Sequence, residues 1–280
     1  MRLKSFLKEK LVRVKKEKIL IPCLEGTILQ GKKALITGGS SGIGYAIAKS
    51  FLKNGSSVVI CGRNSKRLEE AKKKLVTECK CSLSDVTTLE LDISSVENMK
   101  KILNNFLKDN RIDIFVNNAG VNFGKVFPET SEEDYDKVLN TNLKGMYFIS
   151  QIIAKYMVEN RIHGNILNIT SSSSLRPGVS PYIVSKWGER SLTLGLAKKY
   201  LSYGIIVNGL APGSTLTPML KSESDNDLNL NSSPSERYAA PEEIGNLATV
   251  MVSDMGRMIV GDTIYATGGA GVITFDDAAY

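Results

Sequence analysis

The stretch Thr-Gly-Gly-Ser-Ser-Gly-Ile-Gly at residues 37–44 decides the fold. It follows the apolar run KALIT at 33–37 and leads into a helical pattern at 43–54. Glycines let the backbone turn tightly and approach a pyrophosphate, and the start of a helix offers free N–H groups and the positive end of its dipole. The spacing is GxxxGxG rather than the commoner GxGxxG, but the strand–turn–helix order still indicates a dinucleotide site. A plain tight turn is the alternative.

Short apolar runs alternate with helical patterns along the rest of the chain. Strands are predicted at 33–37, 57–61, 89–93, 112–117, 164–170, 204–210 and 262–267. Helices are predicted at 43–54, 64–78, 95–109, 131–158, 182–202 and 241–253. Continuous β-branched, apolar runs are typical of strands covered on both faces. The alternation predicts an α/β, Rossmann-like, doubly wound parallel sheet flanked by helices, in a single domain over residues 30–280.

The charge is unevenly distributed. The 280-residue chain has a formal net charge of +7, and residues 1–18 hold eight of its basic residues but only two of its acidic ones. The rest is therefore close to neutral, which argues against a nucleic-acid-binding surface. Apolar residues at helical spacing predict a basic amphipathic helix over 1–21, within an extension at 1–29. Residues 1–20 could contact an anionic membrane surface, pack on a partner or stay solvated.

The four cysteines, at 23, 61, 79 and 81, have no disulfide or zinc spacing. No apolar stretch is long enough to span a membrane, and no signal peptide is recognisable. We therefore expect reduced thiols, no metal, and a protein that is cytoplasmic or associated with a membrane surface. The polar stretch Lys221–Ser235 predicts a long loop, within a substrate loop at 213–240.

The end of the second strand bears on cofactor choice. It reads Cys61-Gly62-Arg63-Asn64, where an acidic residue would bind the adenosine ribose hydroxyls. The guanidinium of Arg63 suits a 2′-phosphate instead. This favours NADP(H), with a solvated surface arginine as the alternative.

The sequence Tyr182-Ile183-Val184-Ser185-Lys186 begins a predicted helix. Tyrosine and lysine four residues apart share one face of a helix. A neighbouring ammonium favours the phenolate and lowers the pKa of the phenol from its ordinary value of about 10. The pair therefore predicts a general acid/base.

With these motifs in order, the chain resembles the short-chain dehydrogenase/reductase family in its compact single-domain form, over about residues 30–270. The resemblance rests on TGGSSGIG (37–44), Asp92, NNAG (117–120), NTNLKG (140–145), NITSS (168–172), YIVSK (182–186), PGSTLT (212–217) and a late GD…GG (261–269).

The resemblance implies a role for each matching position. Tyr182 would be the general acid/base, Lys186 would lower its pKa and hold the nicotinamide ribose, and Ser171 would bind the substrate oxygen. Asn142, in the predicted long helix, would anchor a water molecule that links Lys186 to solvent. The residues implied to bind the cofactor are Gly38, Ser40, Ser41, Gly42, Ile43, Gly44, Arg63, Asp92, Ile93, Asn118, Ala119, Gly120, Tyr182, Lys186, Pro212, Gly213 and Thr217.

Two departures from the family pattern leave alternatives open. The gap between Ser171 and Tyr182 is short and lies in a serine run, so Thr170 or Ser172 could supply the catalytic hydroxyl. Ser41 stands where NADPH-dependent members often carry a basic residue, so NAD(H) remains an alternative cofactor.

These features predict an NADP(H)-dependent oxidoreductase that transfers a hydride between nicotinamide and a carbonyl or secondary alcohol. The alternatives are a non-catalytic NAD(P)-binding regulatory protein and a nucleotide-sugar-modifying enzyme on the same fold. The polar loop slightly favours a small, sugar-like substrate. The family resemblance also implies a homodimer or homotetramer, and Trp187 could lie at a subunit contact.

Overall fold

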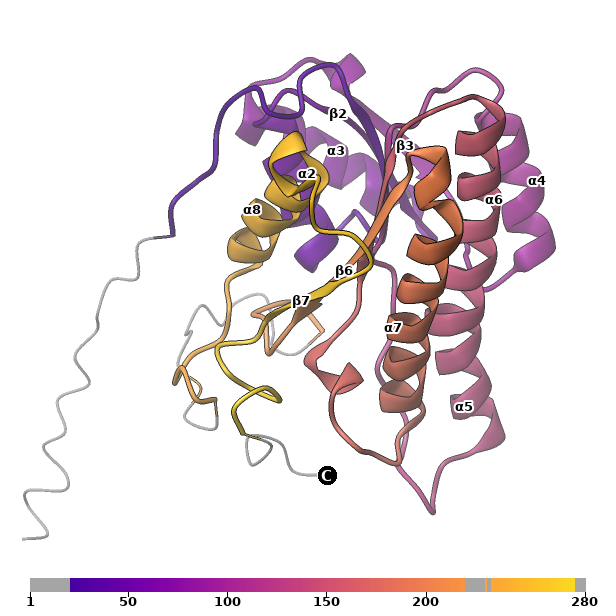
Figure 1. The fold of residues 1–280 in the computed structure, drawn as a ribbon, viewed down its shortest axis with the longest axis vertical. Coiled ribbons are helices and arrows are strands. Elements are labelled where there is room, and N and C mark those ends of the chain that lie inside the picture. Colours follow the sequence, from indigo (N-terminus) through magenta and orange to yellow (C-terminus); the bar gives the residue numbers. More distant parts are fainter. Residues whose placement is uncertain (1–20, 220–229, 231–232, 275–280) are drawn as a thin grey trace, which may run out of the picture.

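Seven parallel strands form one sheet in the part of the chain that the structure, a computed structural model, describes: residues 21–219, 230 and 233–274 (Figure 1). The strands are β1 (Lys33–Thr37), β2 (Ser57–Gly62), β3 (Val86–Glu90), β4 (Ile114–Asn117), β5 (Asn165–Ile169), β6 (Ile206–Pro212) and β7 (Thr263–Ala266). Their order is β3-β2-β1-β4-β5-β6-β7. The predicted helix at 1–21 and most of the predicted loop Lys221–Ser235 lie outside the described residues.

Helices cover both faces of this sheet (Figure 1). They are α2 (Gly42–Leu52), α3 (Ser65–Cys79), α4 (Val96–Phe106), α5 (Glu132–Leu139), α6 (Met146–Glu159), α7 (Pro181–Tyr200) and α8 (Pro241–Val252). Helices α2, α3 and α8 pack on one face, around Ile47, Phe51 and Leu75. Helices α4, α6 and α7 pack on the other, around Met99 and Ile153. The result confirms the predicted Rossmann-like, doubly wound arrangement.

The chain reverses its direction of travel across the sheet at β1. Strand β1 pairs with β2 on one side and β4 on the other, both in parallel register. The connections after β1 and β4 therefore leave the same edge of the sheet in opposite directions, and such a switch point leaves a crevice where ligands bind. The glycine turn, which is the TGGSSGIG stretch at residues 37–44, and the NNAG motif at 117–120 face each other across this crevice.

The third strand was predicted at 89–93, and that position was wrong. Strand β3 runs from Val86 to Glu90. It lies at the edge of the sheet, so most of its residues are only half-buried and the apolar signal is weak. Leu91 and Ile93 lie beyond the strand and fill the core with 2% and 6% exposure, which is why the apolar pattern pointed there.

The helix predicted over 131–158 is confirmed as an uninterrupted helical run from Glu132 to Glu159, but part of this run is not α-helical. A π-helical segment, η2 (Asn140–Gly145), separates α5 from α6. Asn142 lies in this segment, and its side chain bonds both the N–H and the C=O of Val121. Such a tertiary contact leaves no trace in hydrophobic periodicity, and single π turns often mark functional sites.

Residues 22–29, which the sequence assigned to the extension, pack against the domain. The Asn246 side chain accepts a hydrogen bond from the Leu24 N–H and donates one to the Pro22 carbonyl. Leu29 is buried in the core beside α2. Among the described helices, none has the length and apolar character needed to cross a bilayer.

Candidate active site

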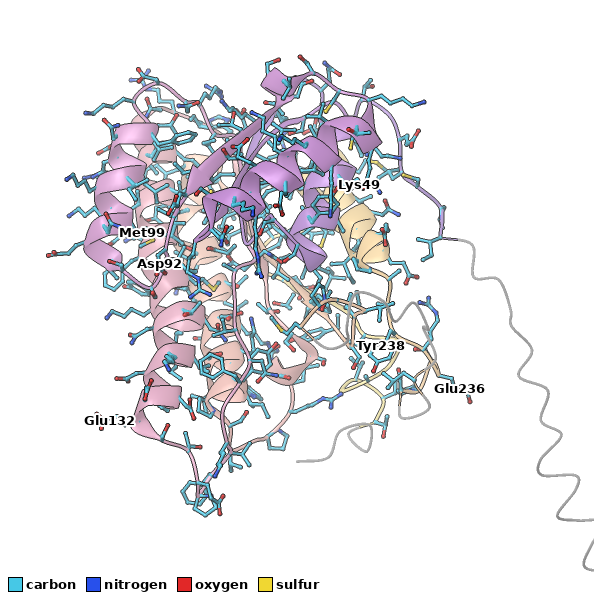
Figure 2. The ribbon with its side chains drawn as sticks, turned by 180° about the vertical axis from the view of Figure 1, so that it is seen from behind. Lys49, Asp92, Met99, Glu132, Glu236 and Tyr238 are labelled. Atoms are coloured by element: carbon cyan, nitrogen blue, oxygen red, sulfur yellow. The ribbon has the colours of Figure 1, made fainter. Side chains whose placement is uncertain are left out.

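A cavity of about 360 Å³ opens at the carboxyl edge of the sheet, at the switch point between β1 and β4. Most of the predicted cofactor residues line it: Gly38, Ser40, Ser41, Gly42, Ile43, Arg63, Asp92, Ile93, Asn118, Ala119, Gly120, Tyr182, Lys186 and Thr217. Asp92 is labelled in Figure 2, which shows the side chains around the sheet. The wall also includes residues that were not predicted to bind the cofactor: Thr37, Cys61, Leu91, Arg67, Val121, Thr141, Ile169, Pro218 and Met219.

The glycine turn fits a bound pyrophosphate. Gly38 and Gly42 have φ angles of +65° and +55°, which disfavour any side chain. Ser41 is the N-cap of α2, but its side chain does not cap the helix, and the first turn holds no acidic residue. The backbone N–H groups of this turn and the helix dipole are therefore available to an anion at the cavity wall.

Asn118 ties the glycine turn to the end of β4. Its side-chain nitrogen donates to the carbonyls of Thr37 and Gly38 at 2.9 and 3.3 Å. The Thr37 hydroxyl accepts in return from the N–H groups of Asn118 and Ala119 at 2.9 and 3.0 Å. The two loops that face each other across the switch point are thus held in fixed relation.

Basic side chains border the cavity at the end of β2. Arg63 and Arg67 both line it, and Asn64 between them caps α3 by accepting from the Arg67 N–H at 2.9 Å. Asp92, on the neighbouring wall, accepts from the N–H and hydroxyl of Ser94 at 2.9 and 2.7 Å. Arg67 was missed by the sequence analysis, and its place in the first turn of α3 brings it to the cavity.

Tyr182 and Lys186 reach the cavity from the first turns of α7. Pro181 opens this helix, and the Ser180 side chain caps it by accepting from the Ile183 N–H. The Lys186 ammonium lies 5.4 Å from the centre of the Tyr182 ring. The predicted acid/base pair is therefore assembled beside the glycine turn.

A buried carboxylate that the sequence analysis missed lies behind this pair. Lys186 Nζ donates to both carboxylate oxygens of Glu189, each at 2.9 Å. Burial works against the charge on Lys186, but Glu189 and then Tyr182 outweigh it, so the pKa of Lys186 is raised. Burial raises the pKa of Glu189 to about 7, against the opposing effect of Lys186. The spacing of seven residues from Tyr182 could have indicated Glu189.

Asn142 approaches Lys186 without lining the cavity. Its side-chain oxygen accepts from the Val121 N–H at 2.8 Å, and its nitrogen donates to the Val121 carbonyl and the Ser185 hydroxyl. A Cβ atom on Gly120 would lie 3.4 Å from the Asn142 oxygen and 3.7 Å from Lys186 Nζ. Asn142 and Lys186 therefore border the same glycine from two sides.

The three candidate hydroxyls lie in different surroundings. Thr170 lines the cavity. Ser171 is 8% exposed, lies outside the cavity wall, and accepts from the Ser173 N–H at 3.1 Å as the cap of a short 3₁₀ turn. Ser172, also 8% exposed, lies within that turn.

Three predicted cofactor residues also stay off the cavity wall. A Cβ on Gly44 would lie 2.4 Å from the Gly38 carbonyl oxygen, and one on Gly213 would lie 2.8 Å from the Thr267 backbone. Both glycines therefore allow close packing. Pro212 ends β6. Within the described residues, histidine, cysteine and acidic side chains do not gather into a group that could hold a metal ion.

Comparison with known proteins decides the family. The model of the short chain dehydrogenase family matches residues 32–228. The chain belongs to the short-chain dehydrogenase family. It is accordingly an NAD(P)-dependent oxidoreductase that transfers hydride, as its family relatives are.

The similar proteins include acyl-carrier-protein reductases and gluconate 5-dehydrogenases. The chain is 36% identical over 247 residues to a 3-oxoacyl-[acyl-carrier-protein] reductase of Chlamydia trachomatis, covering 86% of this chain and 98% of that one. A gluconate 5-dehydrogenase of Burkholderia cenocepacia, solved with NADP and tartrate, has a TM-score of 0.78 and 28% identity, covering 86% of this chain and 95% of that one. A 3-ketoacyl-(acyl-carrier-protein) reductase of Brucella melitensis, solved with NADH, has a TM-score of 0.76 and 28% identity, with 86% and 98% covered.

Proposed function

We propose that the protein is an NADP(H)-dependent oxidoreductase that interconverts a carbonyl and a secondary alcohol, with Tyr182 as the general acid/base. The observation that carries the proposal is that Tyr182 and Lys186 line the same cavity as the glycine turn. A pyrophosphate site and a proton donor therefore share one enclosed space. Reduction of a carbonyl needs both, because hydride and proton must reach adjacent atoms.

Each residue contributes through its position. When bound, the nicotinamide cofactor supplies or accepts the hydride. Tyr182 donates a proton to the carbonyl oxygen in reduction and accepts it from the alcohol in oxidation. Lys186 would place a positive charge beside Tyr182 and bind a ribose hydroxyl, and its ammonium lies 5.4 Å from the centre of the Tyr182 ring. A hydroxyl from Ser171 would bind the substrate oxygen, with Thr170 and Ser172 as the alternatives.

The preference for NADP(H) is supported by Arg63 and Arg67, which border the cavity where β2 ends. Two guanidinium groups there suit a 2′-phosphate. The solved relatives include one complex with NADP and one with NADH, so family membership alone does not choose between them.

Substitution of Arg63 by alanine should weaken NADPH binding by roughly ten- to a hundredfold and leave NADH binding unchanged, because a hydrogen bond to a charged group contributes about 1.5–3 kcal/mol. Lys66→Ala is the matched control, since Lys66 is exposed, carries the same charge and lies off the cavity wall. Nicotinamide fluorescence titration with both cofactors measures this. Equal losses for NADPH and NADH would contradict the role of Arg63.

For the substrate we propose a small, polar carbonyl or alcohol compound, in line with the sugar-like character expected from the polar loop. The gluconate 5-dehydrogenase relative supports this choice, whereas the acyl-carrier-protein reductases favour a β-ketoacyl thioester. A panel of sugar acids, keto acids, simple alcohols and a β-ketoacyl thioester, followed at the nicotinamide absorbance, tests the proposal. Turnover of the thioester alone would overturn the substrate class. Cofactor binding without any turnover would favour a regulatory protein.

We also propose that the enzyme is a homodimer or homotetramer and acts in the cytoplasm. Apolar side chains on the outer faces of α6 and α7 support assembly: Tyr147, Val184, Trp187 and Leu194 are 49%, 46%, 43% and 52% exposed. A second copy would remove them from water. The free cysteines support a reducing compartment. Light scattering on the purified protein measures the oligomeric state.

A further inference from the structure

One face of α7 carries a line of polar side chains that runs from the cavity into the interior. Tyr182, Lys186, Glu189 and Thr193 follow one another at spacings of four, three and four residues, which places them on one face of the helix. Tyr182 is half-buried, whereas Lys186 and Glu189 are 5% and 2% exposed. An ion pair with little exposure to water thus lies directly behind the proposed proton donor, with Lys186 at the cavity wall.

The contact between lysine and glutamate is bidentate. Both carboxylate oxygens of Glu189 accept from Lys186 Nζ at 2.9 Å. A lysine ammonium is a point charge on a flexible stem, and two acceptors on one rigid carboxylate restrict where it can lie. The ammonium has three N–H bonds, so one stays available for a ligand in the cavity.

The surroundings of this pair are polar but neutral. Thr193 donates to the backbone carbonyl of Glu189 and accepts from Asn168, which in turn accepts from Asn117. Asn142 of the π segment bonds Ser185 next to Lys186. The other charged side chains of α5, η2, α6 and α7 are exposed or half-buried: Glu132, Glu133, Asp134, Asp136, Lys137, Lys144, Lys155, Glu159, Arg190, Lys198 and Lys199. Strands β5 and β6 carry no charged residue.

A buried lysine without a partner loses its proton readily, because burial penalises the charged form by up to several pKa units. Among the described residues, the ionisable groups that act on Lys186 are Glu189 and Tyr182, and together they raise its pKa in spite of burial. Tyr182 can help only as a phenolate. When the phenol is protonated, Glu189 is therefore the group that keeps Lys186 charged.

We propose that Glu189 is a positioning residue that fixes the Lys186 ammonium beside Tyr182 and keeps it charged at alkaline pH. The inference rests on the proposed function, since it gives Lys186 its role next to the proton donor. Loss of the carboxylate would allow Lys186 to become neutral, and Tyr182 would then lose the positive charge that lies beside its ring.

The direct test is a lysine titration on the cofactor-free protein. NMR of protein labelled in its lysine side chains, with the Lys186 signal assigned by its loss in Lys186→Arg, reports protonation without any turnover. In the wild type, Lys186 should keep its proton to at least as high a pH as the exposed lysines. In Glu189→Gln, the midpoint of the Lys186 titration should fall by roughly two pH units or more. In Glu189→Asp, this midpoint should return most of the way to its wild-type value.

A kinetic test follows the same change through the reaction. In Glu189→Gln, kcat should fall by roughly tenfold per pH unit above the new lysine midpoint, while the wild type shows no such decline there. Asp113→Asn is the matched control. Asp113 is also buried and accepts from Arg111 Nε at 2.8 Å, but it precedes β4, at the opposite edge of the sheet from the cavity.

The outcomes separate the two proposals. A wild-type Lys186 that titrates below the exposed lysines overturns the role of Glu189, and this result does not depend on whether Glu189→Gln folds. Equal midpoints in wild type and Glu189→Gln also overturn it, as does the same alkaline decline in Asp113→Asn. If the Lys186 midpoint falls in Glu189→Gln as expected, but the wild type turns over no substrate, the proposed function is overturned. The role of Glu189 in keeping Lys186 charged then still stands.

Discussion

Replacement of Tyr182 by phenylalanine should lower kcat by roughly a hundred- to ten-thousandfold, which is the usual contribution of a positioned general acid. The substitution removes one hydroxyl and keeps the ring, so the Lys186 ammonium retains its place beside the ring face. Steady-state kinetics with the best substrate from the panel gives the value.

The same variant should bind its cofactor almost normally. The glycine turn and the anchoring by Asn118 do not involve the phenol, so the dissociation constant should change by no more than about twofold. Fluorescence titration provides this control and shows that the protein is folded. Turnover near the wild-type level would refute the role of Tyr182, and parallel loss of binding and turnover would indicate a structural defect instead.

Gly44→Ala should destabilise the protein strongly. The new Cβ would lie 2.4 Å from the Gly38 carbonyl oxygen and 2.5 Å from Asn118 Nδ2. Neither atom can move freely, because they are bonded to each other where the turn meets β4. Overpacking of this kind costs about 1–3 kcal/mol, and the displaced turn should also weaken cofactor binding. Chemical denaturation and fluorescence titration measure the two effects.

Gly195→Ala is the matched control for that substitution. Gly195 also lies in a helix, α7, but a Cβ there would meet no atom within 4 Å. Because alanine is a better helix former than glycine, this variant should be more stable by up to about 1 kcal/mol. If both variants lost stability to the same extent, the close approach of α2 to the glycine turn would not be the cause.

The fold could be predicted because its strands are covered on both faces. Strands such as β1 and β2 are almost wholly buried, and their apolar runs stand out from the helical patterns beside them. Strand β3 was misplaced because the edge of the sheet covers it only partly, and its threonines carry little apolar signal. The π segment escaped prediction because it depends on the contact between Asn142 and Val121, which are distant in sequence.

The residues of the candidate site also divide into those that the sequence could predict and those that it could not. Residues in a motif next to a strand end, such as Ser41 and Asn118, reached the cavity wall as expected. Arg67 and Glu189 belong to no motif that was recognised, and their places follow from helix geometry together with the packing of the helix. Glu189 is a long charged residue at helical spacing from Tyr182 and Lys186, so from the sequence it looks like a solvated surface residue, and its burial shows otherwise.

Helix α7 has one side toward the cavity and the other toward solvent. Its inner side carries Tyr182 and Lys186, and its outer side exposes Trp187 and Leu194. Trp187 directly follows Lys186, and Leu194 lies about two turns further along the same helix, so neither side of α7 can shift without moving the other. In the oligomer proposed above, a substitution on the outer side that weakened assembly would therefore also lower turnover. Dilution of the enzyme would then have the same kinetic effect as a substitution of Tyr182 or Lys186.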